Sequence, residues 1–105
     1  MLKKINLAIF FNNYRGIETV KFLRKKKKIN IKNIFLARKN LNKKIIPLLQ
    51  HKKIKYRIID NVNEEKIYKS IKKNNIDFNL LSGFPYILKK NMIASSNFGT
   101  LNLHA

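Results

Sequence analysis

The run Ile5–Phe11 constrains the fold more than any other feature of the chain. Its sequence, INLAIFF, is almost continuously apolar. Such a run is typical of a central strand in a parallel sheet, because that strand is covered on both faces. Asn12–Gly16 follows as a turn, and Ile17, Val20 and Leu23 then form one apolar stripe at helical spacing. The first unit of the chain is therefore predicted to be strand, turn and helix.

The same alternation repeats along the rest of the chain. Strand–helix repeats at short intervals predict a parallel sheet with right-handed crossovers. Asn63 is expected to cap the third helix. We therefore expect an α/β fold with a Rossmann-like parallel sheet and helices on both faces, truncated after about five strands. Further strands are expected at Ile34–Ala37, Tyr56–Ile59, Asp77–Leu81 and Thr100–His104, with helical segments within Leu41–Lys53, from Asn63 to Lys73 and within Lys89–Ala94.

Composition narrows the chemistry that the chain can perform. A length of 105 residues suits one small domain or part of one. The absence of cysteine excludes disulfides and thiolate chemistry. Two histidines and five acidic residues are scattered along the chain, so no metal site is predicted. No apolar stretch approaches the length of a membrane span, and the first residues lack the features of a signal peptide, so we expect a cytoplasmic protein that does not contact membranes.

The net charge of +19 has two explanations. It suits a nucleic-acid-binding surface. It also suits a compositional bias, because Lys, Ile and Asn make up nearly half of the chain and the lysines occur in every segment. Lys25–Lys28 follows an expected helix, where cations oppose the negative end of its dipole. We favour the compositional explanation, and we expect weak nonspecific binding to polyanions in either case.

The end of the chain alternates polar and apolar residues with a period of two. On a strand, residues two apart share a face, so Asn102 and His104 would project together, with Leu101 and Leu103 on the other side. The amide can donate a hydrogen bond to a developing oxyanion, and the imidazole can transfer a proton near neutral pH. The spacing also fits an ordinary edge strand whose polar face carries Asn and His.

Two loops are candidate ligand sites, because loops at the carboxyl ends of parallel strands hold ligands. Gly83–Leu88 follows the fourth expected strand, and Gly83 permits a positive φ. Phe84 and Tyr86 in this loop either offer flat surface to a ligand or pack into the core. In the first strand-to-helix turn, Arg15 either pairs with an anion or is a solvated residue at a helix start. Neither a G-x-G-x-x-G nor a Walker A sequence is present.

The two motifs Leu81–Leu88 (LSGFPYIL) and Gly99–Ala105 (GTLNLHA), in this order and at this separation, resemble the formyltransferase family. That family includes the glycinamide ribonucleotide, methionyl-tRNA and sugar N-formyltransferases. The resemblance extends more loosely back to Met1 through the order of strands and helices. It implies that residues 1–105 are the N-terminal part of a formyltransferase catalytic domain, which is incomplete. Family domains are about twice this long and carry a later Asp, so a missing C-terminal half is an expected partner.

By this resemblance the chain belongs to an enzyme that transfers a formyl group from 10-formyltetrahydrofolate to an amine acceptor. The acceptor would be of the amino-sugar or methionyl-tRNA type. Asn102 would stabilise the tetrahedral oxyanion, and His104 would assist by charge and proton transfer. The remaining implied site residues are Tyr86, Ile87 and Leu88 for the folate cofactor, and Asn12 and Arg15 for the acceptor substrate.

The competing class is a small basic RNA-associated α/β module without catalysis. Asn102 and His104 would then be ordinary edge-strand residues. Ligand choice distinguishes the two classes, because a formyltransferase binds folate. A charge-driven binder prefers RNA and releases it as the salt concentration rises.

Overall fold

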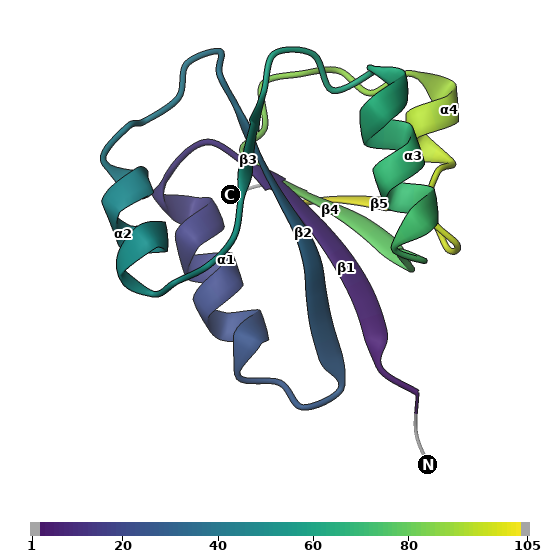
Figure 1. Cartoon of the computed structure of the whole chain (residues 1–105). Coiled ribbons are helices and arrows are strands. Elements are labelled where there is room, and N and C mark those ends of the chain that lie inside the picture. The colour runs from purple at the N-terminus through teal and green to yellow at the C-terminus, as the bar shows by residue number, and fades with distance from the viewer. Residues whose placement is uncertain (1–2, 104–105) are drawn as a thin grey trace.

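A computed structural model, which describes residues 3–103, contains one five-stranded parallel sheet with helices on both of its faces (Figure 1). The strand order is β3-β2-β1-β4-β5. This arrangement confirms the expected Rossmann-like α/β class. The strands are β1 (Ile5–Phe11), β2 (Ile29–Ala37), β3 (Arg57–Ile59), β4 (Phe78–Ser82) and β5 (Thr100–Leu103), and the helices are α1 (Tyr14–Arg24), α2 (Ile45–His51), α3 (Glu65–Lys73) and α4 (Lys90–Ile93).

The core has two layers, one on each face of the sheet. Helices α1 and α2 cover one face, and α3 and α4 cover the other (Figure 1). Strand β1 contributes to both layers, because successive side chains of a strand point to opposite faces. Ile9 and Phe11 pack in the cluster under α1 and α2, whereas Phe10 and Phe35 pack in the cluster under α3 and α4. This double burial is the reason why β1 is apolar at nearly every position.

Two elements begin earlier than the sequence pattern predicts. Helix α1 starts at Tyr14, inside the expected turn, because the side-chain oxygen of Asn13 accepts a hydrogen bond from the Arg15 N–H at 3.1 Å and caps the helix. Strand β2 starts at Ile29 rather than Ile34, because its first residues pair with the amino-terminal half of β1. Both extensions depend on hydrogen bonds that an apolar pattern does not record.

The expectation that Asn63 caps α3 is wrong. Glu64 occupies the N-cap position with an extended backbone and makes no side-chain capping bond. The Asn63 side chain instead holds the segment before α4: its oxygen accepts from the Lys89 N–H at 2.8 Å, and its NH₂ group donates to the Ile87 carbonyl at 3.1 Å. A contact distant in sequence has therefore replaced the local cap.

Gly16 allows α1 to lie directly against β1. A Cβ atom at this position would overlap the ring of Phe11. Gly16 is buried in the middle of this contact. The missing side chain therefore sets how closely α1 approaches β1, and so where the turn between them lies at the edge of the sheet.

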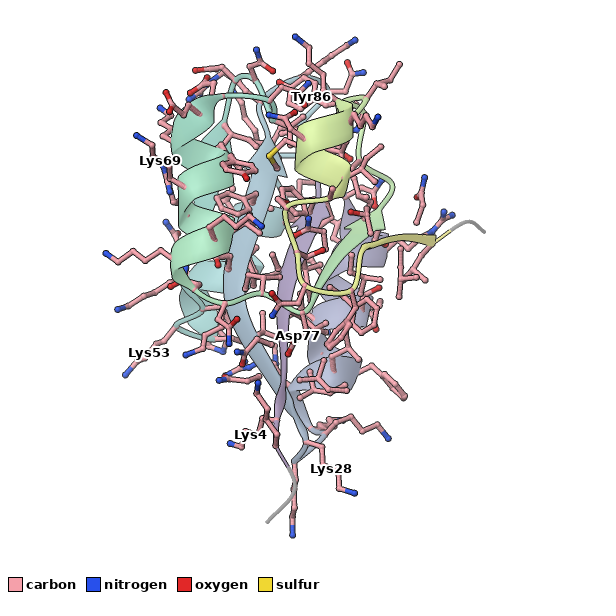
Figure 2. All side chains as sticks on the ribbon, turned by 90° about the vertical axis from the view of Figure 1, so that its right-hand side faces the viewer. Lys4, Lys28, Lys53, Lys69, Asp77 and Tyr86 are labelled. Atoms are coloured by element: carbon pink, nitrogen blue, oxygen red, sulfur yellow. The ribbon has the colours of Figure 1, made fainter. Side chains whose placement is uncertain are left out.

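Asp77 anchors the amino end of β4. Its carboxylate accepts hydrogen bonds from the Asn6 N–H at 2.8 Å and from the Asn97 NH₂ group at 3.0 Å. The bond from the Asn6 backbone, followed by the bond from Asn97, lowers the pKa of Asp77 below its ordinary value. Figure 2 shows Asp77 toward the end of the molecule away from Tyr86. The carboxylate thus joins β4 to β1 and to the loop before β5.

We expect the substitution Asp77→Asn to lower the free energy of unfolding by about 1–2 kcal/mol at pH 7, because one charged acceptor is lost. The folded-state pKa is lowered, so this contribution is present above the unfolded-state pKa, about 4, and is lost as the pH falls through the folded-state pKa. Urea unfolding at about pH 7 and about pH 3 should show the two proteins converging at the lower pH. The exposed control Asp60→Asn should change stability by less than about 0.5 kcal/mol. A difference between native and Asp77→Asn that is the same at both pH values would contradict this role.

Candidate functional site

The topological switch point of the sheet lies between the neighbouring strands β1 and β4, because the strand order runs outward in opposite directions from there. The chain leaves β1 for α1 on one face, and it leaves β4 for α4 on the other face (Figure 1). The two connections diverge at the carboxyl ends of the strands, which is where open α/β sheets bind ligands. The predicted site residues within 3–103 lie in the segments that follow β1 and β4 or in β5 itself. The structure therefore brings them to one edge of the sheet.

Asn12 joins the turn after β1 to the loop after β2. Its side chain is 5% exposed, and its NH₂ group donates to the carbonyls of Lys39 and Asn40, both at 3.2 Å. The Asn42 N–H donates in return to the Asn12 carbonyl at 3.0 Å. The amide of Asn12 thus positions two loops of the edge, and its predicted contact with the acceptor substrate stays a prediction.

Asn13, Ser82 and Gly83 lie together at the carboxyl ends of β1 and β4. Gly83 has a φ of +63°, which confirms the positive φ expected there, and a Cβ atom on it would lie 2.8 Å from the Asn13 side-chain nitrogen. Ser82 is fully buried, and its hydroxyl has no hydrogen-bond partner within residues 3–103. A buried hydroxyl without a partner is unfavourable, and such groups occur at functional positions. Sequence reasoning misses Asn13 and Ser82; the one signal for Ser82 is a serine that ends an apolar strand.

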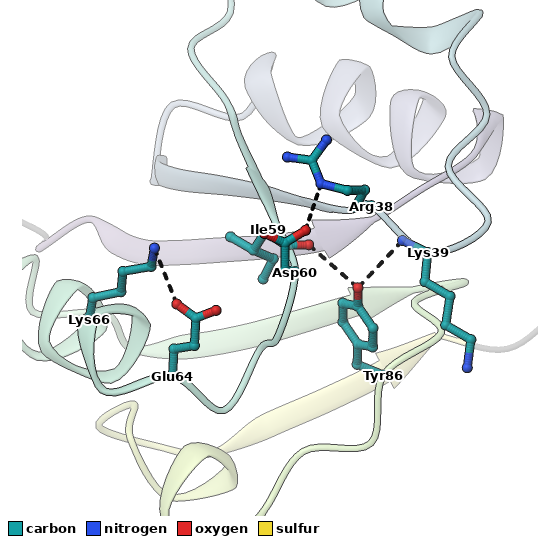
Figure 3. A network of polar contacts seen from close by, with 7 residues as sticks. All are labelled: Arg38, Lys39, Ile59, Asp60, Glu64, Lys66 and Tyr86. Carbon is teal, nitrogen blue, oxygen red and sulfur yellow. Dashed lines mark hydrogen bonds and ion pairs between the residues drawn. The ribbon is translucent and has the colours of Figure 1, made fainter.

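The loop after β4 crosses the ends of the neighbouring strands. The ring of Phe84 meets Phe10 of β1 edge to face, with centroids 5.4 Å apart, and Tyr86 meets Phe84 at 5.3 Å. The Tyr86 hydroxyl accepts from the Lys39 N–H at 3.4 Å and donates to the Ile59 carbonyl at 3.5 Å (Figure 3). Both rings are partly buried and pack against the cluster under α3 and α4, and contact of Tyr86 with folate stays a prediction.

Ile87 differs from its neighbours in this loop. Tyr86 and Leu88 pack against the cluster under α3 and α4, whereas the Ile87 side chain is 89% exposed. The backbone of Ile87 is nevertheless fixed, because its carbonyl accepts the hydrogen bond from Asn63. Among the three residues predicted to contact folate, Ile87 has the most exposed side chain.

Asn102, the predicted catalytic residue of β5, and Arg15, predicted to bind the acceptor, lie on opposite sides of the sheet. Leu101 and Leu103 line an open groove of about 570 Å³ on the α1 side of the sheet, together with Arg15 from the first turn of α1. Asn102 alternates with these leucines and so projects from the opposite face, as its spacing predicts. Asn102 is exposed. His104 lies outside the described residues, so its place beside Asn102 stays a prediction.

The charged side chains around the β4 loop form exposed ion pairs. Arg38 Nε lies 2.6 Å from an Asp60 carboxylate oxygen, and Lys66 Nζ lies 3.2 Å from Glu64 (Figure 3). The Arg38 and Asp60 side chains are 63% and 71% exposed, so this pair contributes little to stability. We assign none of these carboxylates a catalytic role.

Comparison with known protein families and with curated proteins finds no match for this chain. Within residues 3–103, no three His, Cys, Asp or Glu side chains gather as metal ligands would. In the same described part of the chain, every helix is too short or too polar to cross a membrane. The functional assignment therefore depends on the sequence motifs and on the geometry of the carboxyl edge.

Proposed function

We propose that the chain forms part of a formyltransferase that uses 10-formyltetrahydrofolate and an amine acceptor. The observation that supports this proposal is the meeting of three segments at the switch point: the turn after β1, the loop after β4, and β5 with Asn102. The two family-like motifs contribute the second and third of these segments. A cytoplasmic location is part of the same proposal.

The proposed reaction forms one bond and breaks another at the formyl carbon. The lone pair of the acceptor amine attacks the formyl carbon, and a tetrahedral oxyanion forms. The bond from this carbon to N10 of the folate then breaks; the amine loses a proton, and N10 gains one. The products are an N-formyl amine and tetrahydrofolate, with no change in oxidation state.

Each proposed site residue has one role in this reaction. Asn102 donates a hydrogen bond from its NH₂ group to the oxyanion. His104 assists the movement of the proton from the amine. Tyr86, Ile87 and Leu88 contact the folate ring. Asn12 and Arg15 bind the acceptor substrate. An exposed asparagine at the carboxyl edge supports the first of these roles, because a substrate can reach it.

Binding of 10-formyltetrahydrofolate to the full chain tests the proposal directly. We expect isothermal titration to detect binding, and we expect Ile87→Ser to weaken it by about tenfold, since a buried Ile side chain is worth about 1.5 kcal/mol or more. The matched control is Ile93→Ser on α4, because Ile93 is also exposed, at 47%, but is not among the residues predicted to contact folate. The control should leave the affinity unchanged.

Two results would overturn the assignment. One is the absence of folate binding at concentrations up to about 1 mM, because a specific cofactor site would bind more tightly than this. The other is an equal loss of affinity in Ile87→Ser and Ile93→Ser, which would mean that the folate binds somewhere else. Neither result requires the chain to turn over substrate.

A further inference from the structure

The outer edge of β2 is uncovered along its amino-terminal half. Strand β3 pairs only with Phe35–Ala37, so Ile29–Ile34 has no neighbour on that side in the described sheet. Two adjoining hollows of about 440 and 470 Å³ open between this edge and the segment that follows α2. Figure 2 shows Lys53, from that segment, toward the end of the molecule away from Tyr86. The hollows therefore lie away from the proposed formyltransferase site.

Every charged side chain that lines these two hollows is a cation. Arg24 comes from the end of α1, Lys32 from β2, and Lys53 and Lys55 from the segment after α2. Arg57, at the start of β3, lines the second hollow. No Asp or Glu is among the lining residues of either hollow. The uncovered edge is therefore the floor of a positively charged groove.

A third hollow lies between the ends of α1 and α2 and adjoins the first. It has a volume of about 370 Å³, shares Arg24 with the first, and is lined by Lys21, Arg24, Lys25 and Lys52 alone. The three hollows together have 16 lining residues, of which eight are Lys or Arg, whereas Lys and Arg make up 24 of the 105 residues of the chain. Cations are therefore about twice as frequent in this groove as composition alone provides.

Two local backbone irregularities bring lysines into the groove. Leu7 pairs with Ile31 and Ala8 pairs with Asn33, so Lys32 is the extra residue of a β-bulge, a feature that redirects a side chain. Lys53 has a φ of +57° because it follows the end of α2, where the Ile54 N–H donates to the Leu49 carbonyl at 2.9 Å, a common way for a helix to end. The bulge and the helix end thus place both lysines in the lining of the first hollow.

The like charges in the groove are left to repel one another. Within the described part of the chain, Lys21 is the one groove cation with an ion pair, to Glu18 at 3.6 Å. Like charges held close together destabilise the folded chain, and an anion bound among them relieves that repulsion. The groove therefore favours a partner with several negative charges.

We propose that this groove binds single-stranded nucleic acid through its phosphate backbone. Cations spaced along an open edge suit a chain of phosphates better than one phosphate group, and single strands lie in such grooves. The side chains of Asn30 and Asn33 also line the first hollow, but both are hydrogen-bonded within the fold, to Asn6 and to Ser70 and Asn74, so the expected contact is with the phosphates. The isoleucines of the groove lie in its walls, half-buried or buried, rather than protruding as membrane-inserting side chains do. This inference does not depend on the formyltransferase proposal.

Fluorescence anisotropy with a labelled oligouridylate of about 12 nucleotides tests the inference on the full chain. The test variant carries Lys32→Gln, Lys53→Asn and Lys55→Gln, with asparagine at position 53 because it tolerates positive φ. The control variant carries Lys72→Gln, Lys89→Gln and Lys90→Gln, three exposed lysines in α3, just before α4 and in α4 that line none of the hollows. Both variants lose the same net charge, so a difference between them reports on position.

We expect the test variant to bind the RNA at least about tenfold more weakly than the native chain at about 0.1 M salt. Its slope of log affinity against log salt should fall by about 2, since each lost phosphate contact removes about 0.7. The control should change the affinity by less than about threefold. Equal losses in the two variants would show that binding follows overall charge, and would overturn the proposal. Loss in the test variant of binding to anionic vesicles, with RNA binding unchanged, would overturn the choice of a nucleic acid.

Discussion

Replacement of Phe10 by alanine is expected to lower the free energy of unfolding by about 3–5 kcal/mol. Phe10 is fully buried at the centre of β1. Its ring stacks on Phe35 of β2 at 5.0 Å and meets Phe84 of the β4 loop at 5.4 Å. A small side chain would leave a cavity between three segments that are far apart in sequence, and close packing would restrict its collapse. Urea unfolding followed by circular dichroism measures the loss.

The control for this prediction is Phe22→Ala on α1. The Phe22 side chain is 60% exposed, so its removal should change stability by less than about 1 kcal/mol. Phe10→Ala should also loosen the β4 loop, because Phe84 loses its partner in the core. Hydrogen exchange at the Lys39 amide, which donates to the Tyr86 hydroxyl, reports this effect. Similar losses of stability in the two variants would mean that Phe10 does not organise the core.

Asn102→Ala is expected to reduce the rate of formyl transfer by about 10²–10³-fold, if transfer is measured as release of tetrahydrofolate in the presence of an amine acceptor. Loss of one oxyanion-stabilising donor has about this effect in acyl-transfer enzymes. Asn102 is exposed, so its removal should leave the stability within about 0.5 kcal/mol of the native value. Affinity for 10-formyltetrahydrofolate should change little, because the oxyanion exists only during the reaction.

Two further variants separate the role of Asn102 from a general effect of substitution. Asn102→Asp keeps the shape but has no NH₂ donor, so it should be as slow as Asn102→Ala. Asn91→Ala makes the same change at an exposed position on α4 and should retain the native rate. Native-like rates in both Asn102 variants would remove this residue from the mechanism.

Local patterns in the sequence were sufficient for most of the fold. The strand β1 begins and ends where its apolar run does, and α4 lies within the segment expected for it. Pro47 lies near the start of α2, in its first turn, where a residue without an N–H is tolerated. The predictions for β1 and α4 succeed because burial on two faces and helical spacing act within a few residues of the chain.

The candidate site was only partly visible in the sequence. Its motifs indicated the loop after β4 and the strand with Asn102, and the fold brings both to the same edge of the sheet. They left open whether Tyr86 packs against the core, and they did not indicate the buried Ser82 hydroxyl. Whether an aromatic ring faces a ligand or the core depends on the residues packed against it. Here those residues, such as Phe10 and Ile59, come from other strands.

The sequence by itself determined the α/β class, the succession of strands and helices, and the excess of positive charge. The tertiary structure decided the strand order, the clamp of Asn63 on the β4 loop, and the convergence of Lys32 and Lys53 on one groove. The physical reason is the range of the interactions. Helix and strand formation depends on neighbours within about four residues, whereas strand pairing, loop packing and charge clusters join residues that are distant along the chain and meet only when it folds.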